Sequence, residues 1–251
     1  MSRLFFTTVG TSSMFRLPPE IDRDDPQTCY NFLLDLFLRT YRENPEAVLG
    51  YSAELKSVFK AGVTKEDLVV LISTDTVQGY MCGRLLSDFL GDSVGCDVHL
   101  EQVEGLQMKD AIRFKEVGLH NYLDFLFRTY HCYEASHRII INLTGGFKGV
   151  IPYSTMAAML LGLPIVYVFE FSDELIYLPA LPLSVDSVWY SQRLERFSLL
   201  EEGTVDETVF FEGMSMQERE EMGLVVDCQE GQVRLSAIGR LVWERFGRNK
   251  P

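Results

Sequence analysis

Three short polar turns hold most of the residues in this chain that could do chemistry. Each follows a run of apolar residues and stands just before a predicted helix, where free backbone N–H groups and hydroxyls gather. Glycine in such a turn lets a ligand approach the main chain closely. The turns therefore predict an anion-binding site, although helix capping would explain each turn taken alone. They are Gly10-Thr11-Ser12-Ser13, Ser73-Thr74-Asp75-Thr76 and Thr144-Gly145-Gly146-Phe147-Lys148.

Lys148 is the most distinctive residue of the three turns. It follows a Gly-Gly pair at the predicted end of a strand, where its ammonium group could project over a ligand. A cation in that place can stabilise negative charge that develops on a phosphate during a reaction. The alternative is an ordinary surface lysine in the first turn of a helix.

The sequence lacks the signatures of dinucleotide, P-loop and metal sites. No Gly-x-Gly-x-x-Gly follows the first apolar run, and no turn fits the phosphate-binding loop of nucleotide triphosphatases. The four histidines, at positions 99, 120, 131 and 137, have no ligand spacing. We interpret them as solvated or packed side chains, and we expect neither a metal nor a cofactor.

Aliphatic runs alternate with amphipathic segments in the part of the chain that carries the turns. This order predicts an α/β fold, a mostly parallel Rossmann-like sheet with helices on both faces. Because ligands bind at the carboxyl ends of such strands, the three turns should share one edge of the sheet. The last two strands follow each other too closely for a crossover and should form an antiparallel hairpin. The expected strands are 4–9, 68–73, 94–103, 138–143, 165–171 and 175–181, and the expected helices 28–43, 47–59, 77–90, 108–133 (bent near Gly118) and 151–161.

The length of 251 residues suits one α/β domain and a smaller appendage. We place the ligand-binding domain at residues 1–183 and a second domain at 184–251. The second domain is expected to hold a helix over 184–200, a helix over 216–222, a hairpin around Glu230-Gly231 and a helix over 237–246 capped by Ser236. That order suggests a small winged-helix-like unit.

The composition limits the function classes. A net charge of −13 disfavours a large nucleic-acid footprint, since Lys and Arg supply most non-specific affinity for phosphates, but a small anion in a local pocket remains compatible. Five cysteines without a Cys-x-x-Cys pair indicate free thiols in a reducing compartment. No signal peptide and no apolar run of about 18 residues is visible, so we expect a cytoplasmic protein.

Five motifs occur in the order seen in CARF proteins, the CRISPR-associated Rossmann-fold family, and the chain resembles that family over about residues 1–181. The rest of the chain resembles the winged-helix tail that several such proteins carry. The motifs are Val9-Gly10-Thr11-Ser12, Tyr51-Ser52-Ala53-Glu54-Leu55, Ile72-Ser73-Thr74-Asp75-Thr76, Gly105-Leu106 with Gly118-Leu119-His120-Asn121, and Asn142-Leu143-Thr144-Gly145-Gly146-Phe147-Lys148.

The resemblance implies a homodimer that binds cyclic tetra- or hexa-adenylate, a messenger made by type III CRISPR complexes. It further implies a ring nuclease that ends antiviral signalling by cutting the ring, most simply the tetra-adenylate, to linear di-adenylate with a 2′,3′-cyclic phosphate. In this type, Ser12 and Lys148 match the catalytic residues, with Thr11 and Ser13 as neighbours that could share the serine's role. The cleavage would be metal-independent, by in-line attack of a ribose 2′-hydroxyl, and the remaining residues of the three turns would bind the ligand.

Three alternatives stay open. The chain could be a non-catalytic sensor that acts as a winged-helix transcriptional regulator, but helix 237–246 offers only Arg240 and Arg245, which disfavours DNA binding. It could be a messenger-activated nuclease, but the tail after residue 181 has no histidine and is too short for a separate catalytic core. The third is an α/β protein of unrelated function. The tail could also serve the dimer or a lid, with Trp189, Tyr190 and Trp243 as packing residues.

Overall fold

The computed structural model describes residues 2–107, 109–169, 173–181, 185–201 and 203–247. The chain divides into two compact units, residues 1–154 with 163–180 and residues 155–162 with 181–251. The predicted domain boundary at 183–184 lies outside the described residues, as do residue 108 of the expected long helix and residues 170–172 of the expected fifth strand. Within the described parts of the chain, no helix is both long and apolar enough to cross a membrane.

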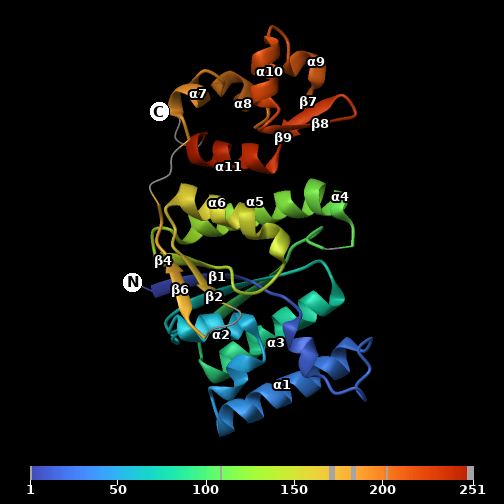
Figure 1. Cartoon of the computed structure of the whole chain (residues 1–251), viewed down its shortest axis with the longest axis vertical. Coiled ribbons are helices and arrows are strands. Elements are labelled where there is room, and N and C mark those ends of the chain that lie inside the picture. Colours follow the sequence, from blue (N-terminus) through green and yellow to red (C-terminus); the bar gives the residue numbers. More distant parts are fainter. Residues whose placement is uncertain (1, 108, 170–172, 182–184, 202, 248–251) are drawn as a thin grey trace. The chain divides into compact units, whose positions relative to one another are not determined.

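A six-stranded sheet forms the centre of the first unit (Figure 1), in the order β3-β2-β1-β4-β5-β6. The first five strands in the chain pair in parallel, and β6 pairs antiparallel with β5. Both features confirm the predicted mostly parallel sheet and its terminal hairpin. The strands are β1 (Ser2–Thr8), β2 (Leu68–Ser73), β3 (Asp97–Gln102), β4 (His137–Asn142), β5 (Ile165–Val168) and β6 (Leu175–Leu178).

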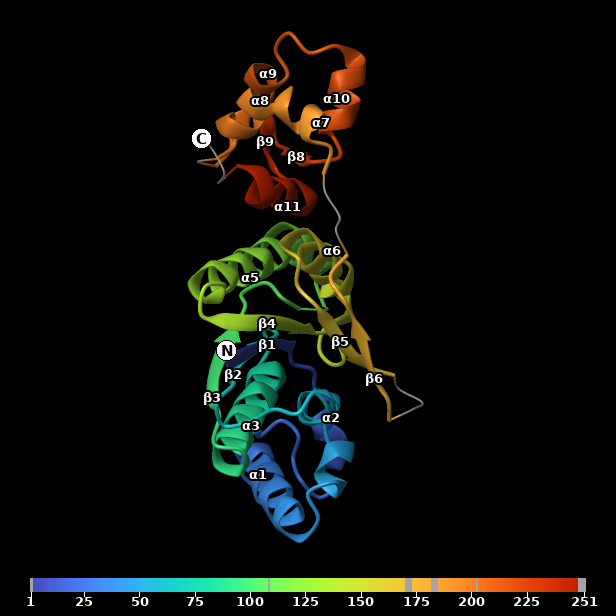
Figure 2. The same cartoon turned by 90° about the vertical axis from the view of Figure 1, so that its left-hand side faces the viewer.

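Helices lie on both faces of this sheet (Figure 2), as predicted. Because side chains alternate along a strand, Phe5 of β1 joins the core beneath α2 (Ala53–Lys60) and α3 (Val77–Ser93), and α1 (Pro26–Glu43) packs on α3. Phe6 points to the other face, where its ring lies 6.1 Å from that of Tyr122 in α5 (Leu119–Tyr133). The helix α6 (Ile151–Leu161), which begins in the first unit, has the predicted bounds.

Two expected helices are divided in the structure. The segment 47–59 forms a 3₁₀ turn, η2 (Ala47–Gly50), and then α2, because the Ser52 hydroxyl caps α2 by accepting the Leu55 N–H at 3.3 Å. The segment 108–133 forms α4 (Ala111–Arg113), a π-helical turn η3 (Phe114–Gly118) and α5. The predicted bend therefore takes the form of a π turn that ends at Gly118, as π turns inside helices commonly do.

The second unit has a small three-stranded sheet in the order β7-β9-β8 and its own core. Phe197, Tyr190 and Trp243 are buried there, and the rings of Phe197 and Trp243 stack at 6.2 Å. The expected helix 184–200 consists of two short helices, and its first residue lies outside the described parts. The elements are α7 (Ser187–Ser191), α8 (Leu194–Leu199), β7 (Val205–Asp206), α9 (Glu207–Phe210), α10 (Met216–Met222), β8 (Val226–Gln229), β9 (Gln232–Leu235) and α11 (Ala237–Phe246).

The close approach of Gly118 to Gly105 yields a stability prediction. A Cβ at position 118 would lie 2.2 Å from the Gly105 carbonyl oxygen, a backbone atom that cannot move aside easily. We expect Gly118→Ala to lower the free energy of unfolding by about 1–3 kcal/mol, measured by urea denaturation. Gly91→Ala in α3 is the matched control, because nothing lies within 4 Å of the added Cβ. The control should be neutral or stabilising, and equal unfolding of both variants would contradict the prediction.

Candidate anion-binding site

Two of the three polar turns meet at the centre of the sheet. They follow β1 and β4, which are neighbours although they lie far apart in the sequence. The Thr8 hydroxyl donates to the Gly145 carbonyl oxygen at 2.7 Å. Gly146 has a φ of +92°, and a Cβ there would lie 2.4 Å from Thr8 Oγ1. A side chain at position 146 would therefore be both strained and overlapping, so the glycine permits the contact between the turns.

Glu54 contacts both turns, by a hydrogen bond to the first and by close packing against the second. Its side chain comes from the first turn of α2 and is 2% exposed. Oε1 accepts the Gly10 N–H at 2.7 Å, and Oε2 accepts the Ser52 hydroxyl at 2.6 Å. A Cβ on Gly145 would lie 2.1 Å from Oε1, so the second turn also rests on this carboxylate. The Gly10 N–H is thus used inside the protein, and Gly10 contributes close packing to the site more than a free donor.

The charge on Glu54 also acts on a neighbouring thiol. Burial, and after it the carboxylate of Glu54, raises the pKa of Cys82 to about 12. Cys82 therefore stays a protonated thiol at neutral pH, and it serves as a packing residue of the core.

The turn after β2 is held by contacts of its own. The Thr76 hydroxyl accepts the Gly79 N–H at 3.0 Å and caps α3, and it lies 3.0 Å from the Thr74 hydroxyl. Asp75 Oδ2 accepts the Gly105 N–H at 2.9 Å. These groups have partners within the protein, which agrees with the capping interpretation of this turn. Their role in ligand binding stays a prediction.

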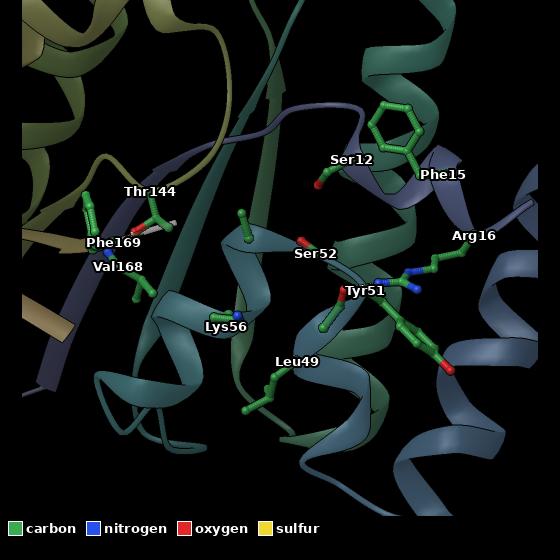
Figure 3. A pocket seen from close by; sticks show the side chains of 12 residues that line it. Ser12, Phe15, Arg16, Leu49, Tyr51, Ser52, Lys56, Thr144, Val168 and Phe169 are labelled. Carbon is green, nitrogen blue, oxygen red and sulfur yellow. Dashed lines mark hydrogen bonds between the residues drawn. The ribbon is translucent and has the colours of Figure 1, made fainter. Parts of the chain in front are cut away.

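A cavity of about 300 Å³ opens beside the first and third turns. Figure 3 shows Ser12 and Arg16 on one side of it, Thr144 on the other, and Lys56 between them. Among the described residues that line it, Arg16 and Lys56 are the charged ones, and none is an Asp or Glu. The sequence patterns do not point to either cation. Neither stands in a polar turn after a strand, and both look like ordinary charged residues of short helices.

The first turn has three hydroxyl side chains, and their surroundings differ. Ser12 lines the cavity, and its Oγ is buried without a hydrogen-bond partner among the described residues. Ser13 is 1% exposed and lies in the interior, whereas Thr11 is exposed and does not line the cavity. A buried hydroxyl without a partner is costly. Of the three hydroxyls, that of Ser12 is best placed to donate to a group in the cavity.

Lys148 is not among the residues that line the cavity. It is exposed and opens the 3₁₀ turn η4 (Lys148–Val150), which leads into α6. The preceding Phe147 packs its ring edge-to-face on Phe114 of the π turn, with 4.8 Å between the ring centres. The structure therefore brings Ser12 and Thr144 to one cavity, and it anchors the lysine end of the third turn beside η3.

No group of three or more His, Cys, Asp or Glu side chains is arranged to hold a metal ion within the described residues. His99 and His131 each lie beside a surface glutamate, at 3.7 Å from Glu101 and 3.4 Å from Glu134. The absence of a metal from the reaction stays a prediction for an assay.

The buried carboxylate under the turns gives a second stability prediction. We expect Glu54→Ala to cost about 2–4 kcal/mol of unfolding free energy, because the part-buried Gly10 N–H and the buried Ser52 hydroxyl lose their acceptor. Glu54→Gln keeps an oxygen for the Gly10 N–H and should cost about 1 kcal/mol. Glu66→Ala, at an exposed acid, is the control and should change stability by less than about 0.5 kcal/mol. Urea denaturation measures all three, and equal losses for the two Glu54 variants would refute the linking role.

The chain is similar to known proteins in sequence and in fold. The model of a CRISPR-associated protein family, Cas_APE2256, matches residues 49–181. Csm6 of Enterococcus italicus, solved bound to cyclic hexa-2′-fluoro-hexa-dAMP, is 10% identical with a TM-score of 0.42, over 80% of this chain and 46% of that chain. Can2 from Sulfobacillus thermosulfidooxidans, solved with cyclic tetra-adenylate, is 12% identical with a TM-score of 0.40, over 98% of this chain and 64% of that one. The chain thus spans less than two thirds of either protein. No curated protein matches it in sequence.

The family match covers just over half of the chain. It extends from the 3₁₀ turn before α2 to the residues after β6, and it includes Glu54, Lys56 and the turn that ends in Lys148. The first turn, with Ser12, precedes the matched residues. In agreement with the CARF resemblance of its motifs, the chain belongs to the CRISPR-associated family described by the Cas_APE2256 model.

Proposed function

We propose that this protein binds a cyclic oligoadenylate, cyclic tetra-adenylate first, and cuts it to linear di-adenylate. One observation carries the proposal. Two glycine turns that pack on Glu54 border a cavity whose described charged lining residues, Arg16 and Lys56, are cations, in a chain with a net charge of −13. A local concentration of positive charge in an acidic protein favours a small anionic ligand over a long nucleic acid. The CRISPR-associated family supports a nucleotide messenger as that ligand.

The proposed functional unit is a homodimer that holds the ring across its two-fold axis. Several apolar side chains at the carboxyl edge of the sheet are exposed and would be covered by a second copy. Phe15, Val77 and Ile112 are 82%, 60% and 69% exposed, on elements that follow β1, β2 and β3. Large exposed apolar side chains at one edge of a sheet are compatible with an interface. A dimer would place two cationic cavities around one ring.

The proposed chemistry uses the nucleophile of the substrate. A ribose 2′-oxygen attacks the adjacent phosphorus, the new 2′-O–P bond forms, and the P–O5′ bond breaks. The 2′-hydroxyl loses its proton and the leaving 5′-oxygen gains one, so the products are a 2′,3′-cyclic phosphate and a 5′-hydroxyl. The task of the protein is to hold these atoms in line, which can lower the barrier by several kcal/mol. Two such cuts, one in each protomer, yield two molecules of linear di-adenylate.

Ser12 and Lys148 have separate roles in this proposal. Ser12 donates its hydroxyl proton from within the cavity to a phosphate or ribose oxygen of the ring. Lys148 is exposed and does not line the cavity, so in this proposal it meets the scissile phosphate outside the cavity and stabilises the charge that builds up there. The scissile phosphate would then lie at the mouth of the cavity.

The sensor alternative depends on DNA binding by the second unit. The order of a helix, a strand, two helices and a hairpin, with the sheet order β7-β9-β8, supports a winged-helix-like arrangement. In such an arrangement the DNA-reading helix precedes the hairpin, so it would be α10 and not the helix 237–246 considered from the sequence. This helix carries Glu218, Glu220 and Glu221 against Arg219. Three carboxylates facing phosphates would repel DNA, which favours the ring nuclease over the regulator.

A lysine variant tests the catalytic proposal. Lys148→Ala should bind cyclic tetra-adenylate with nearly unchanged affinity and cut it at least about 100-fold more slowly, because an electrostatic stabiliser of the transition state is lost. Chromatography and mass spectrometry of the products, with cyclic hexa-adenylate as a second substrate, measure the rate and the ends formed. Lys65→Ala is the matched control, since this exposed lysine precedes β2 at the opposite edge of the sheet. Cleavage by Lys148→Ala at the rate of the control would refute the role.

Metal independence is tested separately. Cleavage by the unmodified protein should continue at the same rate in excess EDTA, since the 2′-hydroxyl and the chain's own groups supply the chemistry. Loss of cleavage in EDTA, restored by Mg²⁺ or Mn²⁺, would overturn the metal-free mechanism.

A further inference from the structure

Lys56 and Arg16 define the electrostatic character of the cavity, and each is held in place by the protein. The Arg16 guanidinium lies 4.9 Å from the centre of the Tyr51 ring and donates to the Gly50 carbonyl oxygen at 2.5 Å. Lys56, from the first half of α2, donates from Nζ to Asp173 Oδ1 at 2.8 Å. The Arg16 contacts leave several guanidinium N–H groups for a ligand.

Asp173 is an unusual partner for Lys56. It follows β5 and precedes β6, 117 residues away in the sequence, and 75% of its side chain is exposed against 27% of the lysine. It is not itself a lining residue of the cavity. Lys56 and then Lys60 lower the pKa of the Asp173 carboxyl, so the carboxylate is charged at neutral pH. An exposed anion thus pairs with a lysine of the cavity, and none of the described residues that line this cavity is an acid.

We propose that Lys56 is the phosphate-binding cation of this cavity and that Asp173 is an internal competitor which the phosphate displaces. The inference deepens the proposed function and rests on it for the identity of the ligand, a nucleotide with its phosphodiester groups. The carboxylate stands where a phosphate oxygen of the ligand would go, since both are oxygen anions that accept from an ammonium group. Phe169, which also lines the cavity and is 45% exposed, offers a ring on which a base can rest.

The expected effect of this competition on ligand affinity follows from the strength of such ion pairs. An exposed ion pair of this kind contributes little free energy, so its loss should tighten ligand binding by about three- to fivefold. Loss of the cation itself removes a charged hydrogen bond to the ligand and should weaken binding by about tenfold or more. Because Asp173 acts only through Lys56, removal of the carboxylate should have no effect once the lysine is gone.

Isothermal titration calorimetry on the full chain tests the proposal with two probes. The first is cyclic tetra-adenylate with fluorine in place of each 2′-hydroxyl, which lacks the nucleophile and so separates binding from cleavage. The second is adenosine 5′-monophosphate. Asp173→Asn should lower the Kd about three- to fivefold, and Lys56→Gln should raise it at least about tenfold. The double variant should bind like Lys56→Gln alone.

Two controls match the charge changes. Lys60→Gln removes a cation one turn further along α2 that does not line the cavity, and Asp97→Asn removes an exposed acid at the amino end of β3. Each should change the Kd by less than about twofold. An Asp173→Asn variant that binds like the Asp97→Asn control would overturn the inference, and so would a Lys60→Gln variant as weak as Lys56→Gln.

The two probes separate this inference from the proposed function. If the ring does not bind but adenosine monophosphate binds with the expected order of variants, the ring nuclease proposal fails and the phosphate site stands. If the unmodified protein binds neither probe, the phosphate site is refuted.

Discussion

The buried carboxylate of Glu54 is the constraint on which the rest of the site depends. A carboxylate in the interior is very costly unless hydrogen bonds satisfy it, and here the Gly10 N–H and the Ser52 hydroxyl do so. Each donor belongs to a different segment, so the same bonds that solvate the charge fix the first turn against the start of α2. Gly145 fits only because it has no side chain where the carboxylate lies. Because the buried carboxylate needs hydrogen-bond donors, it fixes the position of the first turn.

Sheet topology explains why these segments can meet. The chain builds β1, β2 and β3 outward in one direction and then returns to place β4 beside β1. A reversal of strand order of this kind is where ligands bind in parallel sheets, and the cavity lies beside the turns that follow β1 and β4. Glu54 and Lys56 both come from α2, one carboxylate pointing inward and one ammonium group lining the cavity. Their spacing of two residues puts them on different sides of the same helix.

The sequence predicts the helices and strands of this protein better than the residues of its site. The bounds of β2, α6 and α11 agree with the apolar patterns, because each is a continuous or periodic run closed by glycine, a capping serine or a polar turn. Ser52 divides the expected helix 47–59, a capping effect that a count of apolar residues overlooks. Glu54 resembles an exposed acid, since acids are favoured in the first turn of any helix. Its burial follows from the approach of the turns after β1 and β4, which local spacing does not contain.

The distribution of charge decides which anions this fold can accept. With a net charge of −13, most of the surface repels a polyanion, and that repulsion extends about 8–10 Å at physiological ionic strength. A long nucleic acid would lie against many carboxylates for each cation that it reaches, whereas a compact ring could place its phosphates on a few cations and leave the rest of the surface untouched. The ion pair between Lys56 and Asp173 fits the same logic, because an acidic protein with an uncompensated cationic cavity would collect anions without discrimination. Under the proposed function, the affinity for the right ligand comes from the number of phosphates that it presents at once, and a single carboxylate is enough to hold the site against weaker anions.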